Sequence, residues 1–393
     1  MTDFHEVVVA GGGPVGLVAA RAFARVGIPV LVLEPRRTGQ SRTGDVRRLV
    51  LAERACRLLE TFGLWTTVVA GASPVRTVLV RAPRTGRVLR LEAHDHGLEA
   101  LGWTLGYGDL VARLEAALVH DPRVTVQHGV ELVAAHENED HLVLRLRHDG
   151  NEEERPARLL VVAEGVGAGL ESLGWPARPS HSARDRAWII PCQASTLDPA
   201  TAVEAFLEGG TATLLVPDRG AAVVTLILPD SVGWPEGPAE SAEILERLAP
   251  RFGLSSRALV PTGEAVSFRV RRGFHPVPVL PRRLIMGSMF HALHPFAAQS
   301  LLLAWRDAHA VARRLGERRL RGQDWSGESA LRDVVRTRLP EHRLIDAFVH
   351  RLPEILALPE PPGLGRLAWR LAGTRHARLL AGYWGMGYGW GRL

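Results

Sequence analysis

The chain has 393 residues, of which 46% are hydrophobic and 23% charged, a balance typical of a globular protein and unlike that of a disordered one. All 48 basic residues are arginines, and the formal net charge is +6. The arginines are scattered, without a basic stripe interleaved with aromatic residues, so we expect no nucleic-acid partner. The length allows two interlocked domains.

The two cysteines, Cys56 and Cys192, lie in separate segments and form no C-x-x-C motif, which indicates a reducing compartment. Acidic residues precede the first apolar run and glycines interrupt it, unlike in a signal peptide. No apolar segment approaches the roughly 18 residues that a membrane-spanning helix needs. We therefore expect a cytoplasmic protein, and the arginines leave open a peripheral contact with an anionic membrane.

Residues 5–10 and 28–33 are short runs of β-branched and other apolar residues, typical of buried strands. The alanine-rich segment between them has helical spacing. The order strand, helix, strand predicts the βαβ unit with which a dinucleotide-binding domain begins.

A glycine-rich turn around Pro14 joins the first strand to this helix, and Gly11, Gly13 and Gly16 fit the pattern G-x-G-x-x-G. Gly11 permits a tight turn, Gly13 lets a pyrophosphate approach the backbone, and Gly16 lets the helix pack on the strand. Glu34 ends the second strand, where it can accept hydrogen bonds from an adenosine ribose. Together these residues predict a dinucleotide site.

A polar loop, residues 35–48, follows, and Arg47 within it is either a partner of the cofactor's phosphates or a solvated charge. We expect a helix over residues 49–62 and a β-hairpin over residues 75–91. Residues 94–96 read His-Asp-His, but adjacent residues on an extended chain point to opposite faces. We therefore predict no metal site there.

The middle of the chain carries further short apolar runs. We expect buried strands at residues 124–128, 130–136, 141–147 and 159–163, the last ending in Glu164 and Gly165. Alternating patterns predict antiparallel strands at residues 188–195, 212–216 and 221–228. Helical spacing predicts helices at residues 108–119, 239–248 and 299–315 and a mostly helical stretch from residue 325.

These elements predict an α/β fold: a Rossmann-like domain with a parallel sheet, interleaved with an antiparallel β-sheet substrate domain and followed by a C-terminal helical region. We assign to the Rossmann-like domain residues 1–74, 97–180 and 271–324. The substrate domain takes residues 75–96 and 181–270, and the helical region takes residues 325–393. A sheet inserted in this way walls off a pocket above a bound cofactor.

Several motifs give the chain a family resemblance. Asp45-Val46-Arg47 followed by Leu51 resembles D-x-R-x-x-A-L, and Glu164-Gly165 stands at a D-G motif. Residues 287–307 align with G-D-A-A-H-x-x-x-P-x-x-G-Q-G-x-N-x-G-x-x-D. With the glycine-rich turn, these motifs resemble the flavoprotein hydroxylases of the p-hydroxybenzoate hydroxylase fold, most closely the UbiH/VisC-type hydroxylases of ubiquinone biosynthesis. The resemblance covers essentially the whole chain.

The resemblance implies an FAD-dependent monooxygenase in which NAD(P)H reduces the flavin. A flavin C4a-hydroperoxide would then hydroxylate an aromatic ring, such as a ubiquinone-precursor-like or polyketide-like phenol. It implies an FAD site made by Gly11, Gly13, Pro14, Gly16, Glu34, Arg47, Glu164, Gly165, Gly287, Ser288, Pro295, Ala298, Gln299 and Ser300. His291 and His294 are candidate catalytic residues or, alternatively, residues that position a loop.

The chain departs from the family at the flavin end. Ser288 replaces an aspartate, Ala298 and Ser300 replace the glycines around the central glutamine, and Phe290 and Leu302 replace a small residue and an asparagine. We expect the side chains at positions 298, 300 and 302 to occupy space beside the isoalloxazine ring. The alternative function is therefore a redox-inactive family member, either an accessory subunit of a biosynthetic complex or a non-redox cyclase.

The partners are expected to be chiefly small molecules, namely the aromatic substrate and the cofactors. The C-terminal aromatic residues, among them Trp384 and Trp390, either pack on the body or rest on a membrane. A homodimer and a biosynthetic complex both stay open.

Overall fold

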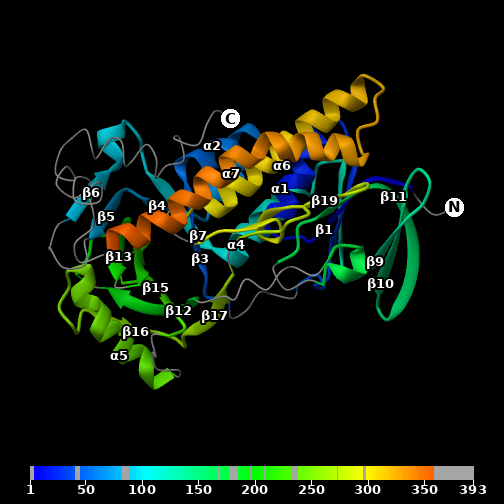
Figure 1. The fold of residues 1–393 in the computed structure, drawn as a ribbon. Helices are drawn as coiled ribbons and strands as arrows, with labels where there is room; N and C mark the ends of the chain where they lie inside the picture. The colour runs from blue at the N-terminus through cyan, green and yellow to red at the C-terminus, as the bar shows by residue number, and fades with distance from the viewer. Residues whose placement is uncertain are drawn as a thin grey trace.

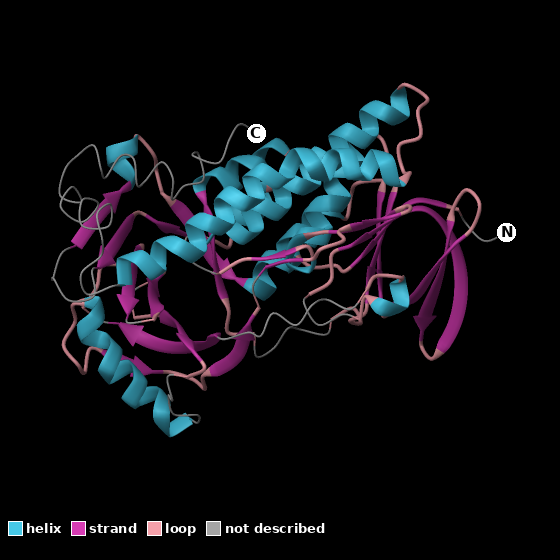
Figure 2. Cartoon of the chain, viewed as in Figure 1, coloured by secondary structure: helices cyan, strands magenta, loops and turns pink. Residues whose placement is uncertain are grey.

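The computed structural model describes residues 4–39, 45–81, 88–165, 169–176, 185–194, 196–207, 209–218, 220–231, 238–271, 273–294 and 298–357. Figures 1 and 2 show two large β-sheets on either side of the molecule, with the helices α1, α6 and α7 lying across the middle. The predicted α/β fold with a parallel and an antiparallel sheet is confirmed.

The first large sheet has the order β19-β20-β11-β1-β2-β8. β1 (His5–Ala10) lies at its centre and pairs in parallel with β2 (Val30–Glu34) and β11 (Asn151–Val162). β8 (Val124–His128) and β20 (Arg283–Ile285) extend the parallel sheet, and β19 (Val279–Leu280) closes one edge antiparallel. The strands are apolar on both faces because helices cover them, as parallel sheets require.

Helices and a meander complete this body. α1 (Pro14–Arg25), α4 (Tyr107–Leu118) and α6 (Gln299–Leu320) pack around the βαβ unit, and the Trp305 indole donates to the Pro14 carbonyl at 3.0 Å. β9 (Val130–Glu137) and β10 (Leu142–His148) form an antiparallel meander with β11. The Trp305 bond fixes the start of α6 against the glycine-rich turn.

The second large sheet has the order β16-β12-β15-β14-β13-β5-β6, with β17 also paired to β12. Its strands are β5 (Thr77–Arg81), β6 (Val88–Glu92), β12 (Asp185–Ala194), β13 (Thr201–Leu207), β14 (Gly210–Val216), β15 (Ala222–Pro229), β16 (Leu259–Pro261) and β17 (Val266–Val270). All pairs are antiparallel except β5 with β13. α5 (Pro238–Leu248) and the 3-10 turn Ala249–Phe252 cover one face.

A small third sheet joins the two bodies, and one of its strands lies where we predicted the start of a helix. Residues 48–52 form the strand β3 (Arg48–Ala52), which pairs with β7 (Gly102–Gly106), and β7 pairs with β4 (Ser73–Val75). The helix predicted from residue 49 begins only at α2 (Glu53–Thr61), followed by α3 (Trp65–Val69). The prediction was wrong because β7, distant in sequence, offers this segment a strand partner.

The remaining elements surround the second motif, residues 287–307. β18 (Gly273–Phe274) pairs with β21 (His291–Ala292), and short 3-10 turns span Glu171–Leu173 and Gly287–Met289. α6 continues to Leu320, beyond the predicted residue 315, and α7 (Glu328–Ala357) packs along it. Across the part of the chain that the structure describes, we find no helix with the length and hydropathy of a membrane span.

Candidate functional site

The turn between β1 and α1 requires glycine at two positions. Gly11 has a φ of +108°, and a Cβ there would lie 2.9 Å from the backbone of Ala163. At Gly16, a Cβ would lie 1.9 Å from the Gly11 carbonyl oxygen. These close approaches let α1 pack directly on the carboxyl end of the central strand.

In front of this turn the backbone faces open space. A Cβ on Gly13 would meet only the Tyr107 hydroxyl, at 3.4 Å, and one on Gly165 would meet nothing within 4 Å. α1 begins at Pro14 without a side-chain hydrogen bond from its N-cap residue. The helix N-terminus therefore offers N–H groups and a positive dipole end to an anion. This space is a cradle that fits the pyrophosphate of a dinucleotide.

Two carboxylates border the cradle. Glu34 is 8% exposed and accepts hydrogen bonds from the backbone N–H groups of Gly12 and Arg36, each at 3.1 Å. These bonds hold its carboxylate beside the turn, where a ribose hydroxyl can reach it. Burial, and then the negative charges of Glu131 and Glu34, raise the pKa of Glu164. A cofactor at this edge therefore meets one fixed carboxylate and one that protonates more readily.

Arg47 lies on the other side of the cradle. Its guanidinium stacks over the Tyr107 ring at 4.0 Å, and its Nε donates to Asp45 at 2.8 Å. Because the Tyr107 hydroxyl faces Gly13, this stacked arginine borders the same space. A planar cation held in this way is suited to phosphate.

Two residues of the second motif have positive φ angles, and one of them is an alanine at a position where the family has glycine. Gly287 has a φ of +62°, and a Cβ there would lie 3.2 Å from Val15 on α1. Ala298 has a φ of 53° and a ψ of 33°, a left-handed conformation that costs an L residue about 1–2 kcal/mol. Ser288 lies in the 3-10 turn after Gly287, and Ser300 is exposed on the first turn of α6.

The larger side chains at the flavin end have defined surroundings. The Phe290 ring lies 4.8 Å from the His342 ring, on the α7 side of the motif, and Leu302 is 1% exposed in the hydrophobic core. Gln299 is buried at the start of α6. Pro295 lies outside the described residues.

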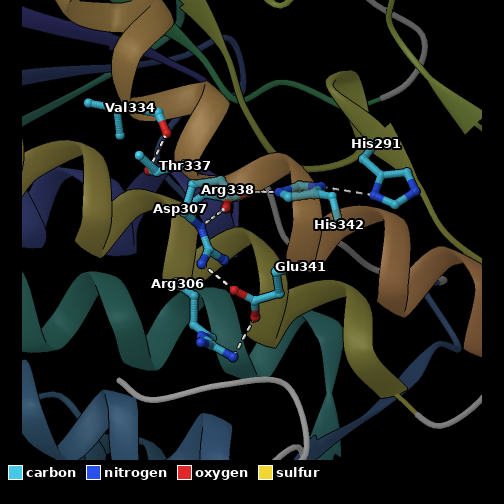
Figure 3. A network of polar contacts seen from close by, with 8 residues as sticks. All are labelled: His291, Arg306, Asp307, Val334, Thr337, Arg338, Glu341 and His342. Carbon is cyan, nitrogen blue, oxygen red and sulfur yellow. Dashed lines mark hydrogen bonds and ion pairs between the residues drawn. The ribbon is translucent and has the colours of Figure 1, made fainter.

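The histidines of this motif are both buried, and His291 belongs to a polar network (Figure 3). The Nδ1 atoms of His291 and His342 lie 3.0 Å apart. The two Nε2 atoms each lie 2.8 Å from a carboxylate oxygen, of Asp346 for His291 and of Asp307 for His342. The Nδ1 contact is a hydrogen bond when one of the two Nδ1 atoms carries a proton and the other accepts it.

Burial lowers the pKa of His291, although the hydrogen bond with Asp346 acts to raise it. On Asp307, burial raises the pKa but is outweighed by His342 and Arg338, and the pKa is lowered. Arg338 donates to Asp307 at 2.8 Å and also pairs with Glu341, which pairs with Arg306. The network therefore links β21 to α6 and α7 through hydrogen bonds and ion pairs.

Sequence reasoning missed the α7 side of this network. Arg338, His342 and Asp346 recur at four-residue spacing, which places them on one face of a helix. That spacing was a usable signal. His294 is buried near the network, at 4% exposed.

The structure holds no metal cluster within the described residues: no three His, Cys, Asp or Glu side chains are placed to bind an ion. Residues 94–96, where we expected a polar loop and no metal site, form part of a 3-10 turn, Ala93–His96. His94 pairs there with Glu92 at 3.0 Å.

A parallel sheet with a glycine cradle at its carboxyl edge, joined to an antiparallel sheet, is an architecture also found in solved structures of flavin-dependent monooxygenases. A family model described as "FAD binding domain" matches residues 5–340, and the chain belongs to this family. It is thus an FAD-dependent monooxygenase, and NAD(P)H is the typical reductant of the family. The redox-inactive alternative is not favoured.

Relatives align over most of their length. The chain is 26% identical over 358 residues to the 3-demethoxyubiquinol 3-hydroxylase of Escherichia coli, covering 88% of this chain and 86% of that protein. It is 28% identical over 364 residues to the protoasukamycin 4-monooxygenase of Streptomyces nodosus, covering 85% and 84%. The crystal structure of p-nitrophenol 4-monooxygenase PnpA from Pseudomonas putida has a TM-score of 0.76 at 15% identity, covering 98% and 99%, which shows a shared fold.

Proposed function

We propose that the protein hydroxylates the aromatic ring of a phenol resembling a ubiquinone precursor or a polyketide, with NAD(P)H as the reductant. The observation that carries the proposal is the open cradle at Gly13, bordered by Glu34 and Arg47. The named substrates of the E. coli and Streptomyces relatives support the two substrate classes.

The ADP end of FAD would be held by Gly11, Gly13, Glu34 and Arg47. The flavin end would lie at the second motif, along Gly287, Ser288, Pro295, Ala298, Gln299 and Ser300. Bound FAD supplies the acceptance of a hydride and the activation of O₂. The protein orients the ring and keeps water from the reacting atoms.

Binding of FAD is expected to be weaker than in relatives that keep the aspartate at position 288. Loss of a charge-assisted hydrogen bond costs about 1.5–3 kcal/mol, and a neutral serine restores about 0.5–1.5 kcal/mol. The net loss of about 1–2 kcal/mol corresponds to a roughly 5- to 30-fold weaker complex.

The test begins with the visible spectrum of the purified protein. Flavin bands are expected as isolated or after incubation with FAD, and a Gly11→Ala variant serves as the control without a usable cradle. The loaded protein should oxidise NADH or NADPH faster with a phenol of the right class and yield a product heavier by one oxygen atom. A protein that stays colourless in excess FAD would refute the proposal.

We also propose that α7 lies on an anionic membrane during turnover. Arg336 and Arg343 are exposed on α7, and Leu344 beside them is 49% exposed. An apolar side chain among arginines suits a lipid interface. Flotation with vesicles of anionic lipid should carry the protein upward, and neutral vesicles should not.

A further inference from the structure

The two faces of the second sheet have different roles. Val203, Ala205, Leu214 and Val224 face α5 and form a hydrophobic core with it. The alternate residues point the other way, and among them Ala202 packs near Val50 of β3. Figure 1 shows α5 on one side of this sheet, and the end of α7 contacts β13 and β14.

This second face is the one turned toward the nucleotide-binding body. β3 begins directly after Arg47, whose guanidinium stacks on Tyr107 beside the cradle. The residues that share a face with Ala202 therefore point to the side of the sheet on which β3 lies. In such architectures, ligand pockets form between the two bodies.

Glu204 is a carboxyl group on this otherwise largely apolar face, which also carries Asp185 at the start of β12. Glu204 of β13 stands opposite Thr213 of β14, and Thr213 stands opposite Thr225 of β15. The same cross-strand row continues with apolar residues on both sides, first Val80 on β5 and Ile189 on β12. A carboxyl and two hydroxyls thus form a short polar row between apolar strands.

Glu204 has little support from the protein. The Thr213 hydroxyl donates to its Oε2 at 2.8 Å, and within the described residues no other hydrogen bond or ion pair reaches it. The residue is half-buried, so part of it borders accessible space. Burial raises the pKa of Glu204 to about 7, although the Thr213 bond acts to lower it.

These surroundings do not suit a structural role. A buried carboxylate without a positive partner opposes folding, and a glutamine would make the same bond with Thr213 without that penalty. A carboxyl group that exchanges its proton near neutral pH is instead suited to accept a proton from a bound ligand.

We propose that Glu204 is a catalytic residue that binds the phenolic hydroxyl of the substrate through Oε1 and takes up its proton. The phenol O–H bond breaks, its electron pair stays on the phenolate oxygen, and the proton forms a bond to Oε1. Phenolate formation enriches the ring with electrons for attack on an electrophilic oxygen. The inference rests on the proposed function and narrows it, because the substrate must present a hydroxyl to the β13–β14 pair.

The test uses FAD-loaded protein and two probes, 4-nitrophenol, whose absorbance reports its ionisation, and its methyl ether, 4-nitroanisole. The variants are Glu204→Gln, which keeps the shape but cannot take a proton, and Glu204→Leu. The matched control is Glu243→Gln on α5, whose side chain is 60% exposed on the far side of the sheet.

The wild type and Glu243→Gln should bind the phenol about tenfold or more tightly than the ether, as expected for a hydrogen bond to a charged group. The difference spectrum of the bound phenol should show an ionisation step that moves to a higher pH in both Glu204→Gln and Glu204→Leu. The preference for phenol should fall toward onefold in both Glu204 variants. Equal affinities for the two probes in the wild type, or an unchanged preference in Glu204→Gln, would overturn the inference.

Two further measurements separate a failure of the proposed function from a failure of the Glu204 inference, and a structural role of Glu204 from a role in substrate binding. The flavin spectrum tests the proposed function on its own, because loss of FAD binding in the wild type would defeat that function whatever Glu204 does. The melting temperature at pH 8 tests a structural role. It should be unchanged or higher in Glu204→Gln, and a clear decrease would mean that Glu204 serves the fold and not the substrate.

Discussion

Replacing Glu204 by glutamine should stabilise the protein in a pH-dependent manner. The pKa of Glu204 rises from 4.5 to about 7 on folding. Because one pKa unit corresponds to about 1.4 kcal/mol, this difference in pKa corresponds to roughly 3 kcal/mol of folding free energy. Because the folded-state pKa is the higher one, the folded protein keeps a proton that the unfolded chain releases between these two pH values.

The direction of the pH effect on stability follows from this difference in bound protons. Below about pH 4.5 both states are protonated and the carboxyl costs nothing, whereas the free energy of unfolding falls as the pH rises and the full penalty is reached above about pH 7. Glutamine does not titrate and still accepts the Thr213 bond. The advantage of Glu204→Gln should therefore grow from near zero at pH 4.5 to roughly 3 kcal/mol at pH 8.

Urea unfolding at pH 4.5, 6 and 8 measures this difference directly. Glu243→Gln, changed at a largely exposed position, should follow the wild type at all three pH values. If Glu204→Gln is less stable than the wild type at pH 8, or if its advantage does not depend on pH, the carboxyl does not lie in the apolar surroundings described above.

Three further changes test the cradle, the flavin-end turn and the histidine pair. Gly11→Ala should weaken FAD binding by roughly 100-fold, measured by flavin fluorescence, because the added Cβ meets Ala163 and strains the turn. Ala298→Gly should raise the free energy of unfolding by about 0.5–1 kcal/mol, since glycine adopts the left-handed turn without strain; a loss of stability would contradict the conformation. His342→Leu should destabilise the protein by about 2–4 kcal/mol in urea unfolding, because it removes one of the two hydrogen-bond partners of the buried Asp307 carboxylate and one of the two partners of His291. A near-neutral effect would show that the network is not formed.

Local pattern was sufficient for much of the fold. The βαβ unit at the start, the glycine turn and the alternating strands follow from residue spacing within about ten positions, and the structure places each of them as predicted. The boundary of α2 could not be predicted in this way. Residues 48–52 became a strand because β7, more than 50 positions away, pairs with them.

The candidate site likewise has residues that local spacing predicts and residues that only packing brings together. Gly11 and Glu34 were readable because a dinucleotide turn has a short, fixed spacing. The His291–His342 contact joins residues 51 positions apart, and Glu204 acquires its role only because β13 turns it to the face opposite α5. The sequence alone thus determined the nucleotide-binding turn and the alternation of strands, which depend on neighbouring residues. Tertiary structure decided which polar side chains share a face and lose water together, since only packing brings distant segments into one environment.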